Sequence, residues 1–432
     1  MRGIVAAMLV AVLGGCSPAL PDAWFGAYRL ADGRLVSLRE STPETLRLRV
    51  FDDGETRRYA LRDGRWEAGE GLTPDSLSGS VLDVDGGVLS LTFTDGRHLD
   101  GRILELPTRT QVLETNGVSL FVRLTLPQGA GPHPAIVIAH GSGDDAATRT
   151  YATPDFFAAH GIAAVVYDKR GTGRSGGSFS MDFHQLADDL AGVADWVAEQ
   201  PEVDAGRIGV AGYSQGGWIG PLAASRSTRL GFVIASYGMI DSPRDEARIE
   251  TEQWFQRRGF DATAVAEAGE LADAGVDVVA SGFTDWVRFD ALAERFRDRA
   301  WMQQLDRTLA DLLRWPHWLV RLVGPYVTPP GLRWDYDSLG ALDLLAARDV
   351  PSAWLIASHD TSAPNAFTLA ELERRRRRGE PVRVRVFDAT DHGFLLFQED
   401  SDGARRYGNF HPDYFRSEVS IARRLAGLDP EP

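Results

Sequence analysis

The chain has 432 residues, 44% hydrophobic and 25% charged, which excludes a disordered or collagen-like protein and is sufficient for two domains. The net charge of −15 disfavours nucleic acid as a partner, because an acidic surface repels phosphate backbones. The single cysteine, Cys16, excludes an internal disulfide framework and a cysteine-based zinc cluster.

Residues 1–21 are predicted to be a targeting segment and linker rather than part of the fold. A short basic start is followed by the apolar run Ile4–Leu13, which is too short for a spanning helix of about 20 residues. Small residues then precede Cys16, and the pattern resembles the bacterial lipoprotein signal. That resemblance implies cleavage before Cys16 and its lipidation, and Ser17 favours an outer-membrane location. A plain secretory signal with an incidental cysteine is the alternative.

Residues 22–105 are predicted to form a small antiparallel β domain. Asp-Gly pairs, which are strong hairpin signals, recur at positions 32–33, 53–54, 63–64, 85–86 and 95–96. Between them apolar and polar residues alternate, so that Leu46, Leu48 and Val50 face one way and the intervening arginines the other. This period of two predicts an antiparallel sheet or a small barrel. Its role as a spacer, an active-site cover or a dimerisation surface is left open.

Residues 106–432 alternate between buried strands and amphipathic helices. Six strands are predicted from apolar runs, four of them continuous enough to be buried on both faces of a parallel sheet. The four are Ala135–Ala139, Ile162–Val166, Ile208–Ala211 and Phe232–Ala235, and the later two are Ala353–Ala357 and Val382–Phe387. The clearest helical stripe runs from Phe183 to Glu199. The alternation predicts an α/β fold with a mostly parallel sheet flanked by helices.

The strongest chemical signal is the stretch from Gly212 to Gly216, which follows a predicted strand and precedes a predicted helix. It matches G-x-S-x-G, a sharp strand-to-helix turn that projects the serine hydroxyl above the sheet. Side chains at the two glycine positions would collide with neighbouring backbone. Ser214 is therefore the predicted nucleophile, and the amide of Gln215 is a predicted donor to the developing oxyanion.

A serine nucleophile needs a base that an acid orients. His392 is the predicted base, because it lies in the loop after the last major strand, from which it can reach the serine. Asp360, in the loop after the preceding strand, is the predicted acid. Asp388 and Asp391 are rivals for that role by their proximity to His392 in the sequence.

The stretch His140-Gly141-Ser142-Gly143 ends the first central strand and is predicted to complete the oxyanion hole. The backbone amide of Ser142 or Gly143 is the second predicted donor. Removing one such donor costs about 3–4 kcal/mol of transition-state stabilisation. His140 itself is interpreted as a structural residue.

Together these motifs resemble the α/β-hydrolase superfamily over residues 106 to 427, and most nearly its dienelactone-hydrolase-like and serine-peptidase-like esterases. The resemblance implies an α/β-hydrolase fold and ester hydrolysis through a covalent acyl-enzyme on Ser214, His392 and Asp360, with no metal or organic cofactor. It does not identify the substrate.

More than a hundred residues separate the strands that end at Ala235 and begin at Ala353, which predicts a helical cap over about residues 241–345. Six tryptophans lie in this insertion. They are predicted either to form an apolar pocket above Ser214 or to pack the cap onto the sheet, and the sequence does not choose between these roles.

Two further motifs are interpreted as structural. The stretch Gly171–Gly176 matches G-x-G-x-x-G, but a dinucleotide site needs a helix at that turn, and the next predicted helix starts only near Met181. Asp168 and Arg170 are expected to form ion pairs there. The five arginines of Arg374–Arg378 are expected to be a solvated helix end.

The sequence thus predicts a serine hydrolase of the bacterial envelope that acts on small-molecule carboxylic esters. An aminopeptidase, thioesterase or acyltransferase on the same triad is the first alternative. A non-catalytic envelope protein that uses the fold for binding is the second. The physiological substrate, the acyl-chain preference and the oligomeric state are left open.

Overall fold

The computed structural model describes residues 20–42, 44–68, 71, 79–328, 330–400 and 403–430. Cys16 and most of the predicted targeting segment lie outside these residues, so lipidation stays a prediction. Within the described part of the chain, no helix combines the length and the apolar character needed to cross a membrane.

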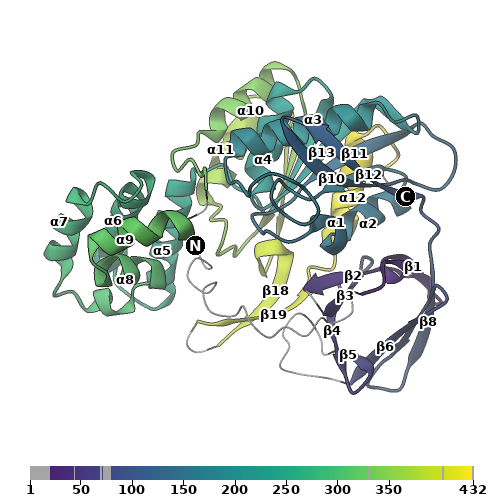
Figure 1. The fold of residues 1–432 in the computed structure, drawn as a ribbon, viewed down its shortest axis with the longest axis horizontal. Coiled ribbons are helices and arrows are strands. Elements are labelled where there is room, and N and C mark those ends of the chain that lie inside the picture. The colour runs from purple at the N-terminus through teal and green to yellow at the C-terminus, as the bar shows by residue number, and fades with distance from the viewer. Residues whose placement is uncertain are drawn as a thin grey trace.

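The N-terminal domain is a closed antiparallel barrel of eight strands (Figure 1). The strands are β1 (Gly26–Leu30), β2 (Leu35–Thr42), β3 (Thr45–Val50), β4 (Thr56–Arg62), β5 (Arg65–Ala68), β6 (Ser80–Asp85), β7 (Val88–Thr92) and β8 (His98–Ile103). Each predicted Asp-Gly pair lies at a connection between consecutive strands, and β8 pairs with β1 to close the barrel. Leu46, Leu48 and Val50 fill its interior, which directs Arg47 and Arg49 outward.

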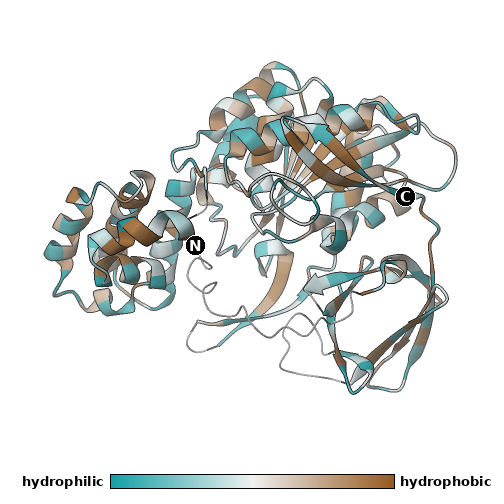
Figure 2. Ribbon diagram, in the orientation of Figure 1, coloured by the Kyte–Doolittle hydropathy of each residue, from teal (hydrophilic) through white to brown (hydrophobic). Residues whose placement is uncertain are grey.

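The second domain is built on an eight-stranded sheet of order β16-β15-β14-β13-β11-β12-β10-β9. The strands are β9 (Thr108–Thr115), β10 (Val118–Thr125), β11 (His133–Ala139), β12 (Ala163–Tyr167), β13 (Val203–Tyr213), β14 (Leu230–Ser236), β15 (Ser352–Ala357) and β16 (Val382–Phe387). The six strands β11 to β16 are parallel, whereas β10 runs antiparallel to β12 and to β9. Figure 2 shows the apolar character of the central strands, which are buried on both faces. This is the predicted α/β-hydrolase fold.

Helices cover both faces of this sheet. One face packs against α3 (Phe183–Ala198), α4 (Gly216–Arg226), α10 (Ser338–Ala347) and α11 (Ala366–Arg377), and the other against α1 (Ala147–Thr150), α2 (Thr153–Ala159) and α12 (Tyr414–Leu425). Because the parallel strands share one direction, the loops after β11, β13, β15 and β16 meet at one edge of the sheet.

The insertion after β14 forms a helical cap with its own apolar core, the green helices at the left of Figure 1. It comprises α5 (Pro243–Arg257), α6 (Ala262–Ala280), α7 (Val287–Phe296), the 3₁₀ helix Ala300–Gln304, α8 (Arg307–Arg314) and α9 (His317–Val327). Leu342 and Leu345 of α10 belong to the core of the sheet, so the cap ends before α10 rather than near residue 345.

A buried charge cluster joins the barrel to the hydrolase domain. Asp155 of α2 accepts a hydrogen bond from Arg39 Nε of β2 at 2.7 Å and from Arg123 Nη1 of β10 at 3.2 Å. Phe51 of the barrel stacks on Phe156, with 4.4 Å between ring centroids. Buried polar contacts of this kind define the position of the barrel against the sheet.

Two local predictions are wrong in part. Arg375 is buried rather than solvated, and pairs with Glu371 at 2.7 Å and Glu380 at 3.0 Å. Asp168 accepts hydrogen bonds from backbone amides, those of Thr148 and Arg174, rather than forming an ion pair. The expected ion pair of Arg170 is present, with Asp189 at 2.6 Å.

Candidate active site

Ser214 lies at the sharp turn between β13 and α4, with a positive φ of 54°. A side chain at Gly212 would place its Cβ 2.1 Å from the carbonyl oxygen of Gly216, and one at Gly216 would come equally close to the oxygen of Ala139. The strained turn therefore requires both glycines. This is the geometry that the G-x-S-x-G stretch predicts.

The loops after β15 and β16 bring two further side chains to Ser214. Nε2 of His392 lies 3.0 Å from Ser214 Oγ, and Nδ1 of His392 lies 3.0 Å from each carboxylate oxygen of Asp360. The amides of Ser362 and Ala363 donate to Asp360 Oδ1 at 2.9 and 2.7 Å, which holds the carboxylate in place. His392 is 178 residues from Ser214 and 32 residues from Asp360 along the chain, yet the three side chains form one connected line of hydrogen bonds.

The charge of Asp360 acts on the imidazole of His392. Burial lowers the pKa of His392, but the attraction and hydrogen bond of Asp360 outweigh it, so that the pKa lies above the ordinary 6.5. The Tyr237 ring packs edge-on against the imidazole, 5.0 Å between centroids, and fixes its orientation further. Nothing in the sequence pattern singled out Tyr237.

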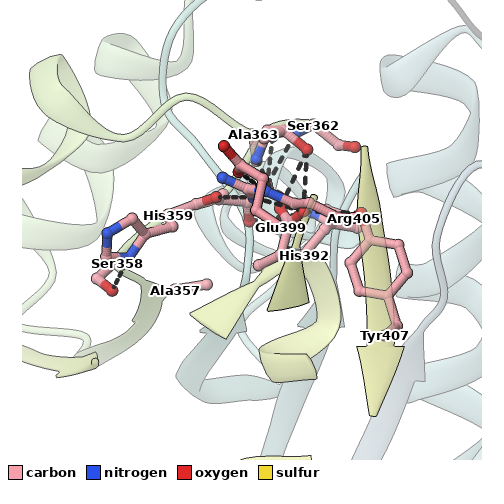
Figure 3. A network of polar contacts seen from close by, with 12 residues as sticks. Ala357, Ser358, His359, Ser362, Ala363, His392, Glu399, Arg405 and Tyr407 are labelled. Atoms are coloured by element: carbon pink, nitrogen blue, oxygen red, sulfur yellow. Dashed lines mark hydrogen bonds and ion pairs between the residues drawn. The ribbon is translucent and has the colours of Figure 1, made fainter. Parts of the chain in front are cut away.

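Asp391, a sequence rival for the acid, is buried but has other partners, among them Arg405 and Tyr407, which Figure 3 shows beside His392. Its carboxylate accepts hydrogen bonds from the amides of Thr361 and His392 at 2.8 Å and from the Tyr407 hydroxyl at 2.8 Å. It also pairs with Arg405 at 2.6 Å. Asp391 therefore holds the loop that carries His392, whereas Asp360 contacts the ring.

The remaining candidates lie apart from this line. Asp388 is exposed. His359 contacts the hydroxyl of the neighbouring Ser358 at 2.7 Å, and His317 stacks on Trp286 inside the cap. His140 is buried, as a structural residue would be.

Two of the three predicted oxyanion donors border the cavity that Ser214 lines. Ser142 and Gln215 line the same cavity as Ser214, whereas Gly143 is not among the residues that line it. Lys169 ties the two sides of this region together, since its Nζ donates to the carbonyl of Gly141 at 2.8 Å and to Gln215 Oε1 at 3.3 Å. Burial lowers the pKa of Lys169 to about 8. No sequence motif predicted this role of Lys169.

A cavity of about 550 Å³ opens between Ser214 and the cap, and is called the cap cavity here. Its lining is mostly apolar and includes Trp315, Leu319, Val323 and Trp334. Trp315 and Trp334 thus have the expected pocket role, whereas Trp286 and Trp301 pack in the cap's own core rather than between the cap and the sheet.

Glu246 of α5 is an acidic exception in this lining. Burial, followed by the charge of Glu250 one helical turn away, raises the pKa of Glu246 to about 8. Among the residues the structure describes, no group of three or more His, Cys, Asp or Glu side chains is arranged to hold a metal ion.

The fold is that of the α/β hydrolases, and Ser214, His392 and Asp360 have the arrangement of the catalytic side chains of a serine hydrolase. Residues 116–318 match the model of the X-Pro dipeptidyl-peptidase (S15) family, a stretch just short of half the chain.

Curated relatives match shorter parts of the chain. An uncharacterized 31.7 kDa protein of the traX-finO intergenic region of Escherichia coli is 29% identical over 131 residues, which cover 29% of this chain and 44% of that protein. The polyketide transferase grgF of Penicillium sp is 34% identical over 95 residues, which cover 22% of this chain and 32% of the transferase. The chain thus spans less than half the length of each.

Among solved structures, the chain is similar to the α/β hydrolase GrgF from Penicillium sp. sh18, with 17% identity and a TM-score of 0.46 over 75% of this chain and 100% of that one. It is also similar to a puromycin-hydrolyzing peptidase of Mycobacterium tuberculosis, with 16% identity and a TM-score of 0.46 over 96% of this chain and 58% of that one.

Proposed function

We propose that this serine hydrolase cleaves carboxylic esters, with Ser214 as nucleophile, His392 as general base and Asp360 as the orienting acid. The observation that carries the proposal is the continuous hydrogen-bonded line from Ser214 Oγ through His392 to Asp360. Each side chain stands in the position that its role requires.

In the proposed reaction, His392 Nε2 takes the hydroxyl proton as Ser214 Oγ attacks the ester carbonyl. The amides of Gln215 and Ser142 stabilise the oxyanion. His392 then protonates the departing alcohol, and Asp360 stabilises the imidazolium in between. Water, activated by His392, releases the acid from the acyl-enzyme. No step in this sequence calls for a metal or an organic cofactor.

The apolar lining of the cap cavity favours a substrate with an apolar acyl group. It borders Ser214 directly, and aliphatic and aromatic side chains of the cap form most of its wall. Each methylene group that such a cavity removes from water contributes about 0.8 kcal/mol to binding. We therefore expect medium-length acyl chains to be preferred over acetyl.

The test is hydrolysis of p-nitrophenyl acetate and butyrate by the purified protein and by Ser214→Ala. Ser225→Ala is the matched control, because Ser225 lies on α4, away from the triad, and its hydroxyl donates to the carbonyl of Leu222. We expect Ser214→Ala to lose turnover and labelling by a fluorophosphonate probe, and Ser225→Ala to keep both. A non-catalytic binding protein would show no serine adduct even in the unaltered chain.

The match to the S15 peptidase family favours a second candidate, amide hydrolysis on the same three residues. The resemblance to a polyketide transferase adds acyl transfer to these alternatives. Aminoacyl anilides and thioesters, assayed beside simple esters, separate the three activities by their relative kcat/KM.

We further propose that the protein is an outer-membrane lipoprotein anchored through Cys16. The sequence pattern around Cys16 supports this proposal. Incorporation of labelled palmitate into the full chain, and its loss in Cys16→Ser with release from the membrane fraction, is the expected result. Membrane association that survives in Cys16→Ser would exclude a lipid anchor at this residue.

A further inference from the structure

A second cavity, of about 570 Å³, lies where the barrel meets the hydrolase domain and is called the barrel cavity here. The barrel contributes Arg47 and Arg49 of β3, and the hydrolase domain contributes Tyr151 and Tyr237. His392 also lines it, whereas Ser214 lines the cap cavity. The two reacting side chains therefore border different cavities.

Arg47 and Arg49 have no carboxylate partner among the described residues. One nitrogen of Arg49, Nη1, is buried without a hydrogen bond. Arg47 donates only to the Thr56 hydroxyl, at 3.4 Å, and lies over the ring of Phe410. Both side chains are half-buried and line the barrel cavity, and no described carboxylate uses the donors of their guanidinium groups.

The acidic groups around the same cavity are engaged elsewhere. Glu40 pairs with Arg149, and Asp145 accepts a hydrogen bond from the Thr150 hydroxyl at 2.6 Å. Burial lowers the pKa of Arg49 to about 10, and burial together with the charge of Arg49 lowers that of Arg47. The cost of holding two like charges here is offset when an anion binds between them.

The proposed reaction places one part of the substrate beside this cavity. In ester cleavage, the Ser214 Oγ–carbon bond forms, the carbon–oxygen bond to the alcohol breaks, and the proton held on His392 passes to the alcohol oxygen. The leaving alcohol must therefore depart beside His392, which borders the barrel cavity, while the acyl group stays with Ser214 and the cap cavity.

We propose that the preferred substrates are esters whose leaving alcohol carries a carboxylate, and that Arg47 and Arg49 bind this carboxylate in the barrel cavity. The inference rests on the proposed esterase function and names its substrate class: an apolar acyl group joined to a hydroxy acid. It gives the barrel a role in specificity, because without it the cavity has no cation to recognise the anion.

The test compares butyryl esters of three phenols that carry the carboxylate at increasing reach: 4-hydroxybenzoate, 4-hydroxyphenylacetate and 3-(4-hydroxyphenyl)propionate. Each is paired with the methyl ester of the same carboxylate, so that members of a pair share the butyryl group and the phenol and differ in the charge and in one methyl group, and release of the phenol is the reaction followed. We expect kcat/KM for the anion to exceed that of its neutral partner by about tenfold or more for at least one spacer, as a charge-assisted hydrogen bond implies. This advantage should fall as salt is added.

Arg49→Met and Arg47→Met are expected to bring this ratio towards one while the neutral esters are still hydrolysed. Arg65→Met is the matched control, since Arg65 lies on the exposed side of β5, and it should leave the ratio unchanged. Because each ratio compares two substrates on one protein sample, partial unfolding lowers both rates and does not imitate the effect.

Inhibition by the free hydroxy acids gives a readout that needs no variant. The acid should compete with neutral-ester hydrolysis by the unaltered protein more strongly than its methyl ester does. The inference would be overturned if the neutral esters are hydrolysed but no spacer gives a preference for the anion and the free acids do not inhibit preferentially. That result would leave the esterase proposal standing. If the unaltered protein hydrolyses none of these esters, the proposed function itself is refuted.

Discussion

Replacing Asp360 by asparagine separates the role of its charge from that of its shape. The amides of Ser362 and Ala363 both donate to Oδ1, so the amide oxygen of an asparagine must occupy that position. Its NH₂ group then occupies the Oδ2 position, 3.0 Å from Nδ1 of His392. An NH₂ group can only donate, so it favours the tautomer in which Nδ1 accepts over the one in which Nδ1–H donates to the oxygen at the Oδ1 position, which is also 3.0 Å away.

The consequence for Ser214 follows from the tautomer. When Nδ1 accepts, the proton resides on Nε2, the atom that must take the proton from Ser214 Oγ. The base is thus blocked although every heavy atom keeps its place. A wrong tautomer of this kind lowers kcat by about 10⁴-fold in a Ser-His-Asp triad. We expect a loss of that size in Asp360→Asn, with little change in KM.

Asp391→Asn is the matched control, since it makes the same change in a buried carboxylate that does not contact the imidazole ring. We expect it to lower the free energy of unfolding by about 1–3 kcal/mol, because Arg405 loses the charge of one buried partner but keeps Glu399 at 3.0 Å. Where the protein is folded, kcat for p-nitrophenyl butyrate should stay within tenfold of the unaltered protein. The reverse order, with Asp360→Asn active and Asp391→Asn inactive while both are folded by circular dichroism, would refute the assignment of the acid.

Three further outcomes follow from the structure. The rate constant kcat/KM should rise with pH through a midpoint above 6.5, because the base works only when neutral and its charge partner raises the pKa of His392; a midpoint below 6.5 contradicts this. Asp155→Ala should lower the free energy of unfolding by about 3–5 kcal/mol, since it leaves Arg39 and Arg123 buried without their partner. Urea unfolding measures this change, and a loss under 1 kcal/mol would show that the charge cluster does not hold the barrel against the hydrolase domain. Along a series of p-nitrophenyl esters from acetate to hexanoate, kcat/KM should rise about fourfold per methylene as the cap cavity removes the chain from water, and a flat series would place the acyl group elsewhere.

The fold was predicted correctly where the local structure depends mainly on residues that are close together in the sequence. Strands buried on both faces show as continuous apolar runs, and Asp-Gly pairs mark tight turns, because each depends on the residues at hand rather than on distant ones. The turn at Ser214 is only partly of the same kind, since a Cβ at Gly212 would collide with Gly216 of the same turn, whereas a Cβ at Gly216 would collide with Ala139 at the end of β11. For the same reason the barrel and the sheet were both predictable, although closure of the barrel was not.

Local patterns did not predict the burial of a side chain whose partners are distant in the sequence. The run Arg374–Arg378 has the pattern of a solvated helix end, yet Arg375 is buried because acidic groups from three places in the chain converge on it.

The sequence by itself determined the order of strands and helices, the nucleophile turn and a short set of candidates for the base and the acid, because these depend on spacing along one chain. Only the tertiary structure decided between Asp360 and Asp391, since both follow strands that end at the same edge and only their contacts differ. It alone placed Arg47 and Arg49, outward residues of an alternating strand, on the cavity that His392 also lines. A period of two tells which face of a strand a residue occupies, but what lies opposite that face depends on how the barrel docks.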